Sequence, residues 1–247
     1  MTSPGIVPES IAYEIHGIPP TLLMTFVSWA FVAGLYILIA RFPSIVPVKV
    51  RMAGEIILEY VVDLANEVIG PKAQRFYPLL LGLFIFILIS NLMGLVPGLI
   101  SPTSDPALPF GLAIMVFIYF NYVGLQENGL RYFKQFMPPK LPLAMFPISV
   151  LLVVVEVISF LIRPFSLGLR LFCNIFSKEL FLGILAMLVL QFLNSDVLGE
   201  RIMTAGPFIL RPFIMILGLV VAFIQALVFT ILTMSYIAGA IQIQEHH

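Results

Sequence analysis

Residues 150–190 read VLLVVVEVISFLIRPFSLGLRLFCNIFSKELFLGILAMLVL, an apolar run that decides the fold although it contains several charges. A helix that crosses a bilayer once needs about 20 apolar residues. The whole apolar region, residues 141–193, is far too long for one perpendicular crossing. It must be steeply tilted, kinked or folded back as a hairpin, and Pro147 and Pro164 are the expected bends.

The composition is that of an integral membrane protein. Of the 247 residues, 60% are hydrophobic and 11% are charged, and the mean hydropathy is +1.08. A soluble domain has about 25% charged residues. The formal net charge is zero, which argues against a nucleic-acid partner. The single cysteine, Cys173, allows no disulfide within the chain and no cysteine-based metal site.

The apolar segments predict an all-α integral membrane protein with about five transmembrane helices in a single membrane domain, residues 1–247. The expected membrane helices are 21–40, 76–100, 109–126, 141–193 and 205–241. Residues 48–69 differ, because Glu55, Glu59 and Asp63 recur every four residues and apolar residues fill the opposite face. This pattern predicts an amphipathic helix at the inner membrane surface, whose charged face contacts either headgroups and water or a partner subunit.

The distribution of basic residues predicts the orientation. The segments 41–75 and 128–140 carry most of the lysines and arginines, whereas the tail 1–20 contains Glu9 and Glu14 and no basic residue. By the positive-inside rule, the N terminus lies outside and the C terminus inside. The tail also lacks the basic-then-apolar pattern of a cleaved signal peptide.

Three charged residues inside the long apolar region share one helix face. Glu156, Arg163 and Arg170 are seven residues apart, which is about two helical turns. Inserting a charged side chain at the bilayer centre costs at least about 2.5–3.5 kcal/mol of free energy. Such residues therefore usually face water or a partner and mark a functional site. The polar residues that extend this stripe are Ser166, Asn174 and Ser177.

The individual charges leave different interpretations open. Glu156 and Arg163 could form a structural ion pair through bending or water, and Arg163 could either snorkel to the inner interface or line a water path. Arg170 has no acidic residue three or four positions away, so a purely structural role is hard to find for it. Glu179 lies nine residues beyond Arg170 and, on a straight helix, points the opposite way.

Two amides lie in other apolar segments. Gln225, in LVVAFIQALVF, could form an interhelical hydrogen bond. Gly218 lies seven residues earlier on the same face, so this stripe also leaves room for a neighbouring helix or water. Asn91, in SNLMG, could bond a helix end or line an outer water path.

No catalytic constellation occurs in the sequence. There is no HExxH, no GxSxG and no glycine-rich phosphate loop, and the three histidines lie in the terminal tails. The chain is therefore not expected to be an enzyme on its own, and neither a metal nor another cofactor is predicted. An ion path is the chemistry that remains.

Four stretches resemble subunit a of the F-type ATP synthase. They are PFSLGLRLFCN at 164–174, IFSKEL at 175–180, IQALVFTILTMSYI at 224–237 and SNLMGLVPG at 90–98. The resemblance covers roughly Asn91 to Tyr236, and the motif around Arg170 is its most specific part.

The resemblance implies a proton-translocating stator subunit with a long tilted helix pair that faces a rotor ring of c subunits. Two offset half-channels would load and unload the ring carboxylates, and Arg170 would be the essential charge that separates them. The residues implied for the outer half-channel are Glu179, Gln225, Asn174 and Asn91, and those for the inner one are Glu156, Arg163 and Ser166. The implied partners are the c-ring, b-type peripheral stalk subunits, the remaining ATP synthase subunits and membrane lipid.

Three positions depart from the family pattern. Cys173 replaces a glycine that many relatives have, Lys178 stands where small residues are common, and Gly218 stands where some relatives have His or Glu. With glycine at position 218, the outer half-channel must rely on other groups and on water.

Two other functions remain open. A secondary ion antiporter would use Glu156 and Glu179 as binding carboxylates, but the repeated halves expected of such a transporter are not found. A membrane scaffold without transport would not explain why the chain places several polar and charged side chains in the membrane, which is energetically unfavourable.

The predicted location is the inner membrane of a bacterium, with the mitochondrial inner and thylakoid membranes as alternatives. The choice between H+ and Na+ stays open.

The orientation can be tested by proteolysis. A protease added outside intact cells should cut the tail 1–20, and the same protease added to inverted membrane vesicles should leave it intact, because the tail is then enclosed. The reverse pattern would overturn the predicted topology.

Overall fold

A computed structural model describes residues 25–31, 33–34, 48–96, 101–129, 131–132, 146–193 and 205–241. These ranges contain helices and turns but no strand, which confirms the all-α class. The elements are α2 (Val48–Ile69), η1 (Ala73–Phe76), α3 (Tyr77–Met93), η2 (Pro102–Ser104), α4 (Ala107–Asn128), α5 (Phe146–Leu193) and α7 (Ala205–Ile241).

Four helical segments in the described ranges are long and apolar enough to cross a membrane. They are Ala73–Met93, Ala107–Asn128, Val150–Phe192 and Pro212–Ile241. The first predicted span, 21–40, lies mostly outside the described residues. Its described part, 25–31 and 33–34, is helical, and Trp29 stacks on Phe86 of α3 with ring centroids 4.6 Å apart.

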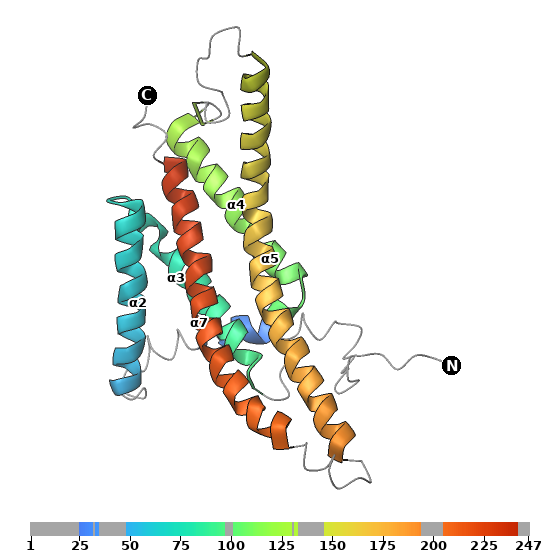
Figure 1. Ribbon diagram of the computed structural model, residues 1–247. Coiled ribbons are helices and arrows are strands. Elements are labelled where there is room, and N and C mark those ends of the chain that lie inside the picture. Colours follow the sequence, from blue (N-terminus) through green and yellow to red (C-terminus); the bar gives the residue numbers. More distant parts are fainter. Residues whose placement is uncertain are drawn as a thin grey trace.

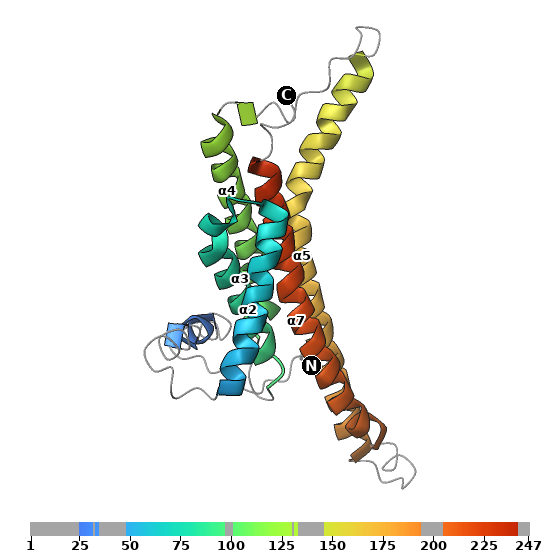
Figure 2. The ribbon, with the colours of Figure 1, turned by 90° about the vertical axis from the view of Figure 1, so that its left-hand side faces the viewer.

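The long apolar region is one continuous helix, so the hairpin alternative is excluded. With 48 residues, α5 is about 72 Å long, more than twice the roughly 30 Å of a bilayer's hydrocarbon core. Pro147 lies in the first turn of α5, where proline is tolerated, and the helix continues through Pro164. The N-terminal part of α5 extends beyond the other helices (Figures 1 and 2).

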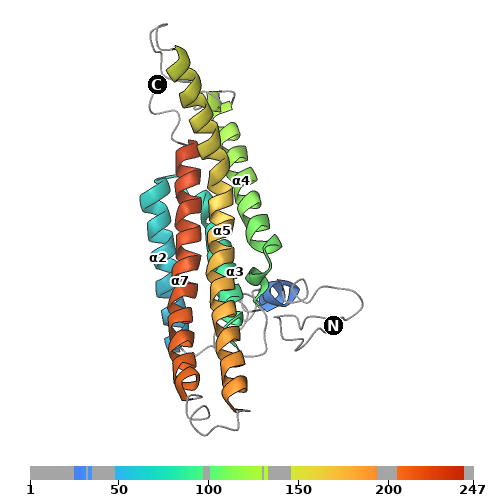
Figure 3. The ribbon, with the colours of Figure 1, turned by 45° about the vertical axis from the view of Figure 1, so that its right-hand side comes forward.

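The helix α7 is the centre of the bundle, because it contacts α2, α3, α4 and α5. Figure 3 shows α5 and α7 side by side, with α2 on the other side of α7. Aromatic side chains fill much of the interior: Phe84 meets Phe223 edge to face with centroids 5.9 Å apart, and Phe120 lies 5.5 Å from Tyr236. Because lipid tails are as apolar as these side chains, their close van der Waals packing, rather than the hydrophobic effect, favours association of the helices.

The helix α2 has two chemically different faces. Val61, Ala65 and Ile69 are buried, whereas Glu59 and Asp63 are exposed. Its location at the inner membrane surface stays a prediction.

Polar contacts connect the end of α4 to its neighbours. The carboxylate of Glu127 accepts hydrogen bonds from Lys72 at 2.6 Å and from Arg75 at 3.2 Å, which ties η1 to α4. The amide of Asn128 donates to the carbonyl of Ala240 at 2.7 Å, which ties α4 to the end of α7. Asn128 is buried, so this second bond is the better protected of the two from water.

Gly168 sets how closely α5 approaches α4. A Cβ at this position would lie 3.0 Å from a ring carbon of Phe110 and 3.2 Å from the carbonyl oxygen of Pro109. Gly168→Val should therefore lower the free energy of unfolding by about 1–3 kcal/mol through overpacking. Gly183→Val, on the same helix with nothing within 4 Å, is the matched control and should stay within about 0.5 kcal/mol of wild type.

The measurement is thermal unfolding in detergent micelles, followed by circular dichroism. Equal melting temperatures for the Gly168→Val and Gly183→Val variants would contradict a close α4–α5 contact.

Candidate functional site

Arg170 lies exposed on an apolar face of α5. Its neighbours Leu169 and Phe176 are exposed as well. Only 6% of the most apolar stretch of α5 is buried, compared with 39% to 44% in the other described spans. Among the described residues, the Arg170 guanidinium has no ion pair and no hydrogen bond. A full charge on such a face needs water or a partner, because burial in lipid is costly.

One helical turn from Arg170, two amides join α5 to α7. The side-chain nitrogen of Asn174 donates to the side-chain oxygen of Gln225 at 2.5 Å. Gln225 is 3% exposed, and its own amide nitrogen has no partner among the described residues. The structure thus brings these two predicted site residues together and leaves one buried donor available.

Among the residues predicted for the inner half-channel, the ion pair between Glu156 and Arg163 that the sequence allowed is not formed. Arg163 and Glu156 form no ion pair, although both side chains are described. The guanidinium of Arg163 instead lies over two rings, 5.7 Å from the centroid of Phe160 and 5.9 Å from that of Tyr236. These cation–π contacts hold Arg163 against the bundle. Ser166 is half-buried between this group and Arg170.

Glu179 faces the opposite side of α5, toward the turn between α3 and α4. Its carboxyl group interacts with the side chain of Ser104 and with the backbone of Ser101. Glu179 and Arg170 are nine residues apart, which on a helix is half a turn in rotation and about 13 Å in height. The two charges therefore occupy different faces and different depths.

Lys178 occupies the space that glycines leave. A Cβ on Gly218 would lie 3.3 Å from Cδ of Lys178 and 2.7 Å from Leu95, and a Cβ on Gly94 would lie 3.2 Å from its ammonium nitrogen. That nitrogen is 3.5 Å from the backbone oxygen of Asn91. Two of the three departures from the family pattern, Lys178 and Gly218, are thus neighbours in space, since the lysine on α5 extends over the glycine on α7.

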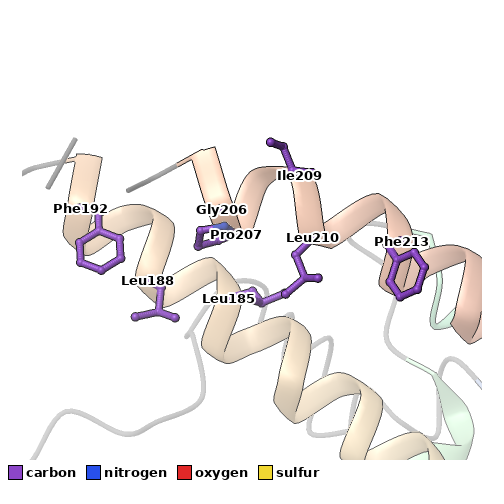
Figure 4. Close-up of a pocket in the computed structure, with 8 residues that line it drawn as sticks. All are labelled: Leu185, Leu188, Phe192, Gly206, Pro207, Ile209, Leu210 and Phe213. Carbon is purple, nitrogen blue, oxygen red and sulfur yellow. The ribbon is translucent and has the colours of Figure 1, made fainter. Parts of the chain in front are cut away.

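The two helices line a half-open cavity beside these groups. It has a volume of about 290 Å³, and its lining includes Asn174, Ser177, Lys178 and Gly218. A larger cavity of about 720 Å³ opens at the far end of the same helix pair (Figure 4). Its lining contains no titratable side chain: Leu185, Leu188, Phe192, Gly206, Pro207, Ile209, Leu210 and Phe213. Of these two cavities, the smaller one has a titratable side chain, Lys178, in its lining.

Asn91 belongs to a buried polar cluster that the sequence did not predict. Ser90, Asn91, Ser101 and Thr103 each have 0% exposed surface. Thr103 donates to the side-chain oxygen of Asn91 at 3.0 Å. The available signal was the polar loop SPTSDP between two apolar segments, but hydroxyls in a loop are common and predict no burial.

Comparisons with known proteins agree on one family. The family model described as ATP synthase A chain matches residues 22–238. The chain is 36% identical over 212 residues to ATP synthase subunit a of a Sulfurihydrogenibium species, covering 86% of this chain and 92% of the relative. It is 36% identical over 234 residues to ATP synthase subunit a 1 of Syntrophotalea carbinolica, covering 95% and 88%. It is also 36% identical over 198 residues to the subunit a of Gluconacetobacter diazotrophicus, covering 80% and 78%.

The amide pair between α5 and α7 gives a test of the site's geometry. In a double-mutant cycle with Asn174→Leu and Gln225→Leu, the coupling energy should be about 0.5–1.5 kcal/mol in favour of the wild-type pair, because the two side chains share one hydrogen bond. The free energies come from unfolding in detergent. A coupling of zero would mean that the two amides do not interact.

Proposed function

This chain belongs to the ATP synthase A chain family and is a membrane-sector subunit of a rotary ATP synthase; on that premise we propose that it translocates protons through two offset half-channels separated by Arg170. The observation that carries the proposal is the exposed guanidinium of Arg170, unpaired among the described residues, on the least buried span. A rotor ring of c subunits, each with a membrane-embedded carboxylate, supplies the partner that this charge requires.

The chemistry of guanidinium suits this role. It stays protonated in proteins, so it keeps its charge in a membrane, whereas a buried lysine can lose its proton. A permanent cation attracts a ring carboxylate and favours its ionised form, which promotes release of the proton. The same cation repels protons and so prevents direct leakage between the half-channels.

The half-channels use the two groups of polar residues on either side of Arg170. In the outer one, Glu179 transfers protons with help from three amides: Asn91, Asn174 and Gln225. In the inner one, Glu156, Arg163 and Ser166 line the way to the other side. The transmembrane potential supplies about 2.3 kcal/mol per proton per 100 mV. This is less than the synthesis of one ATP requires, so several protons must pass for each ATP.

An antiporter remains the alternative function. It would need Glu156 and Glu179 to act on one ion site, but they lie 23 residues apart on one helix, which is roughly 34 Å. This separation favours two half-channels over one shared site.

The remaining assignments follow from the family. The chain contacts the c-ring, b-type peripheral stalk subunits, the other ATP synthase subunits and lipid. It lies in the inner membrane of a bacterium with its N terminus outside; an organelle membrane is the alternative. As a stator subunit, it does not itself hydrolyse ATP.

The test is ATP-driven acidification of inverted membrane vesicles that contain the whole complex. Arg170→Ala should abolish pumping and allow passive proton leakage, because the barrier between the half-channels is lost. Arg170→Lys should lose most of the pumping, since an ammonium that the ring covers and shields from water can deprotonate. Arg131→Ala, at an exposed arginine after α4, is the control and should pump normally. Normal pumping by an assembled Arg170→Ala complex would refute the proposal.

A further inference from the structure

We infer that the turn η1 and the end of α4 form a binding site for the headgroup of an anionic phospholipid. The polar side chains of the site are Lys72, Gln74, Arg75 and Glu127, which line an open cavity of about 370 Å³. The site is separate from the proposed half-channels, because none of the residues assigned to them lines this cavity. The ligand is the phosphodiester of a phospholipid whose headgroup carries no cation.

The cavity lies where two membrane spans end. One span begins at Ala73 and another ends at Asn128, and the two ends meet because the carboxylate of Glu127 binds Lys72 and Arg75. The ends of membrane spans lie at the level of the lipid headgroups. The basic segments of the chain predict that this is the inner leaflet, where basic pockets between membrane helices bind anionic headgroups.

The charges in the wall of the cavity do not cancel. Two cations, Lys72 and Arg75, face one carboxylate, Glu127, so the lining has a net formal charge of +1. The ammonium of Lys72 makes one hydrogen bond among the described residues and carries three protons. The side chains of Lys72 and Arg75 are 56% and 47% exposed. An anion can therefore reach both cations without displacing Glu127.

The guanidinium of Arg75 is held in a fixed orientation. One terminal nitrogen donates to Glu127 at 3.2 Å, the other donates to the side-chain oxygen of Gln126 at 2.6 Å, and the central carbon lies 5.8 Å from the ring centroid of Phe76. These two hydrogen bonds use two of the five N–H groups, and the planar fork suits the oxygens of a phosphate. Because the side chain is already ordered, binding a phosphate costs little further conformational entropy.

An exposed apolar stripe on α4 leads to this cavity. Ile118 and Tyr122 are 62% and 60% exposed, and Gln126 continues the same face at the same spacing of four residues. Gln126 is the residue that binds Arg75, so the stripe ends at a cation. A lipid whose headgroup lies in the cavity can place an acyl chain along the stripe. This continuity favours a lipid over free phosphate, which has no apolar part.

The experiment uses the whole complex, purified in detergent and stripped of lipid, and phosphatidylglycerol with a photoreactive group on its acyl chain. Light should attach this probe to peptides that contain residues 71–77 or 118–127, and the concentration dependence gives an apparent dissociation constant. Unlabelled phosphatidylglycerol should compete about tenfold better than phosphatidylcholine, whose cation opposes those of the site. Inorganic phosphate should not compete, since it lacks an acyl chain.

Charge variants test the assignment of the headgroup site. Lys72→Gln and Arg75→Gln should each raise the dissociation constant about tenfold, because each removes a charge-assisted hydrogen bond. Lys72→Arg keeps the charge and should bind like wild type. Glu127→Gln should lower the dissociation constant about fivefold, because it removes the only negative charge of the lining. The matched control is Arg131→Gln, at an exposed arginine outside the lining, which should bind like wild type.

The opposite results would overturn the inference. Equal losses for Lys72→Gln and Arg131→Gln would mean a general attraction between charges, and weaker binding by an assembled Glu127→Gln complex would mean that the cations serve only their ion pairs. Full competition by inorganic phosphate would mean a site for free phosphate. Labelling of another subunit alone would mean that a protein covers this surface. None of these results concerns pumping, so the proposed function is tested separately by Arg170→Ala.

Discussion

A helix of 48 residues is about 72 Å long while a bilayer core is about 30 Å thick, and most of the molecule follows from this mismatch. A helix this long stays within lipid only by lying steeply tilted, and α7, which runs beside it, must share that tilt. A tilted pair presents a broad face at one depth of the membrane. The shorter helices α3 and α4 cover the opposite face, so α5 is left the least buried of the described spans.

Two faces of α5 carry different chemistry because of helical rotation. Arg170 is exposed and has no ion-pair or hydrogen-bond partner among the described residues, whereas Glu179, half a turn away, lies against the turn η2. Within the proposed function, the exposed face presents a fixed charge to a moving partner. The covered face keeps the titratable carboxyl group of Glu179 beside the hydroxyl of Ser104 and the backbone of Ser101.

The sequence predicted the elements well and their contacts poorly. Long apolar runs correctly predicted the four described membrane spans, because length and hydropathy can be read from a local stretch of sequence. Continuity through Pro164 was undecided, since a proline within a helix can be accommodated when tertiary packing supports it. The meeting of Lys178 with Gly218 was missed, because it joins positions 40 residues apart whose substitutions were each noted separately. The burial of Ser101 and Thr103 was missed for the same reason, since a hydroxyl's neighbours are set by tertiary packing.

The arrangement of charges also constrains the path of a proton within the proposed function. A proton held on Glu179 must pass around α5 to reach the face of Arg170, because the two groups point in opposite directions. The small cavity between α5 and α7 lies beside this route, and Ser177 and Asn174 are part of its lining. Asn174, which lines the cavity, also donates a hydrogen bond to Gln225, and the amide nitrogen of Gln225 has no partner among the described residues. That donor is buried and suited to an ordered water, so the amide pair holds the two helices together and, within the proposed function, supplies a polar point close to Arg170.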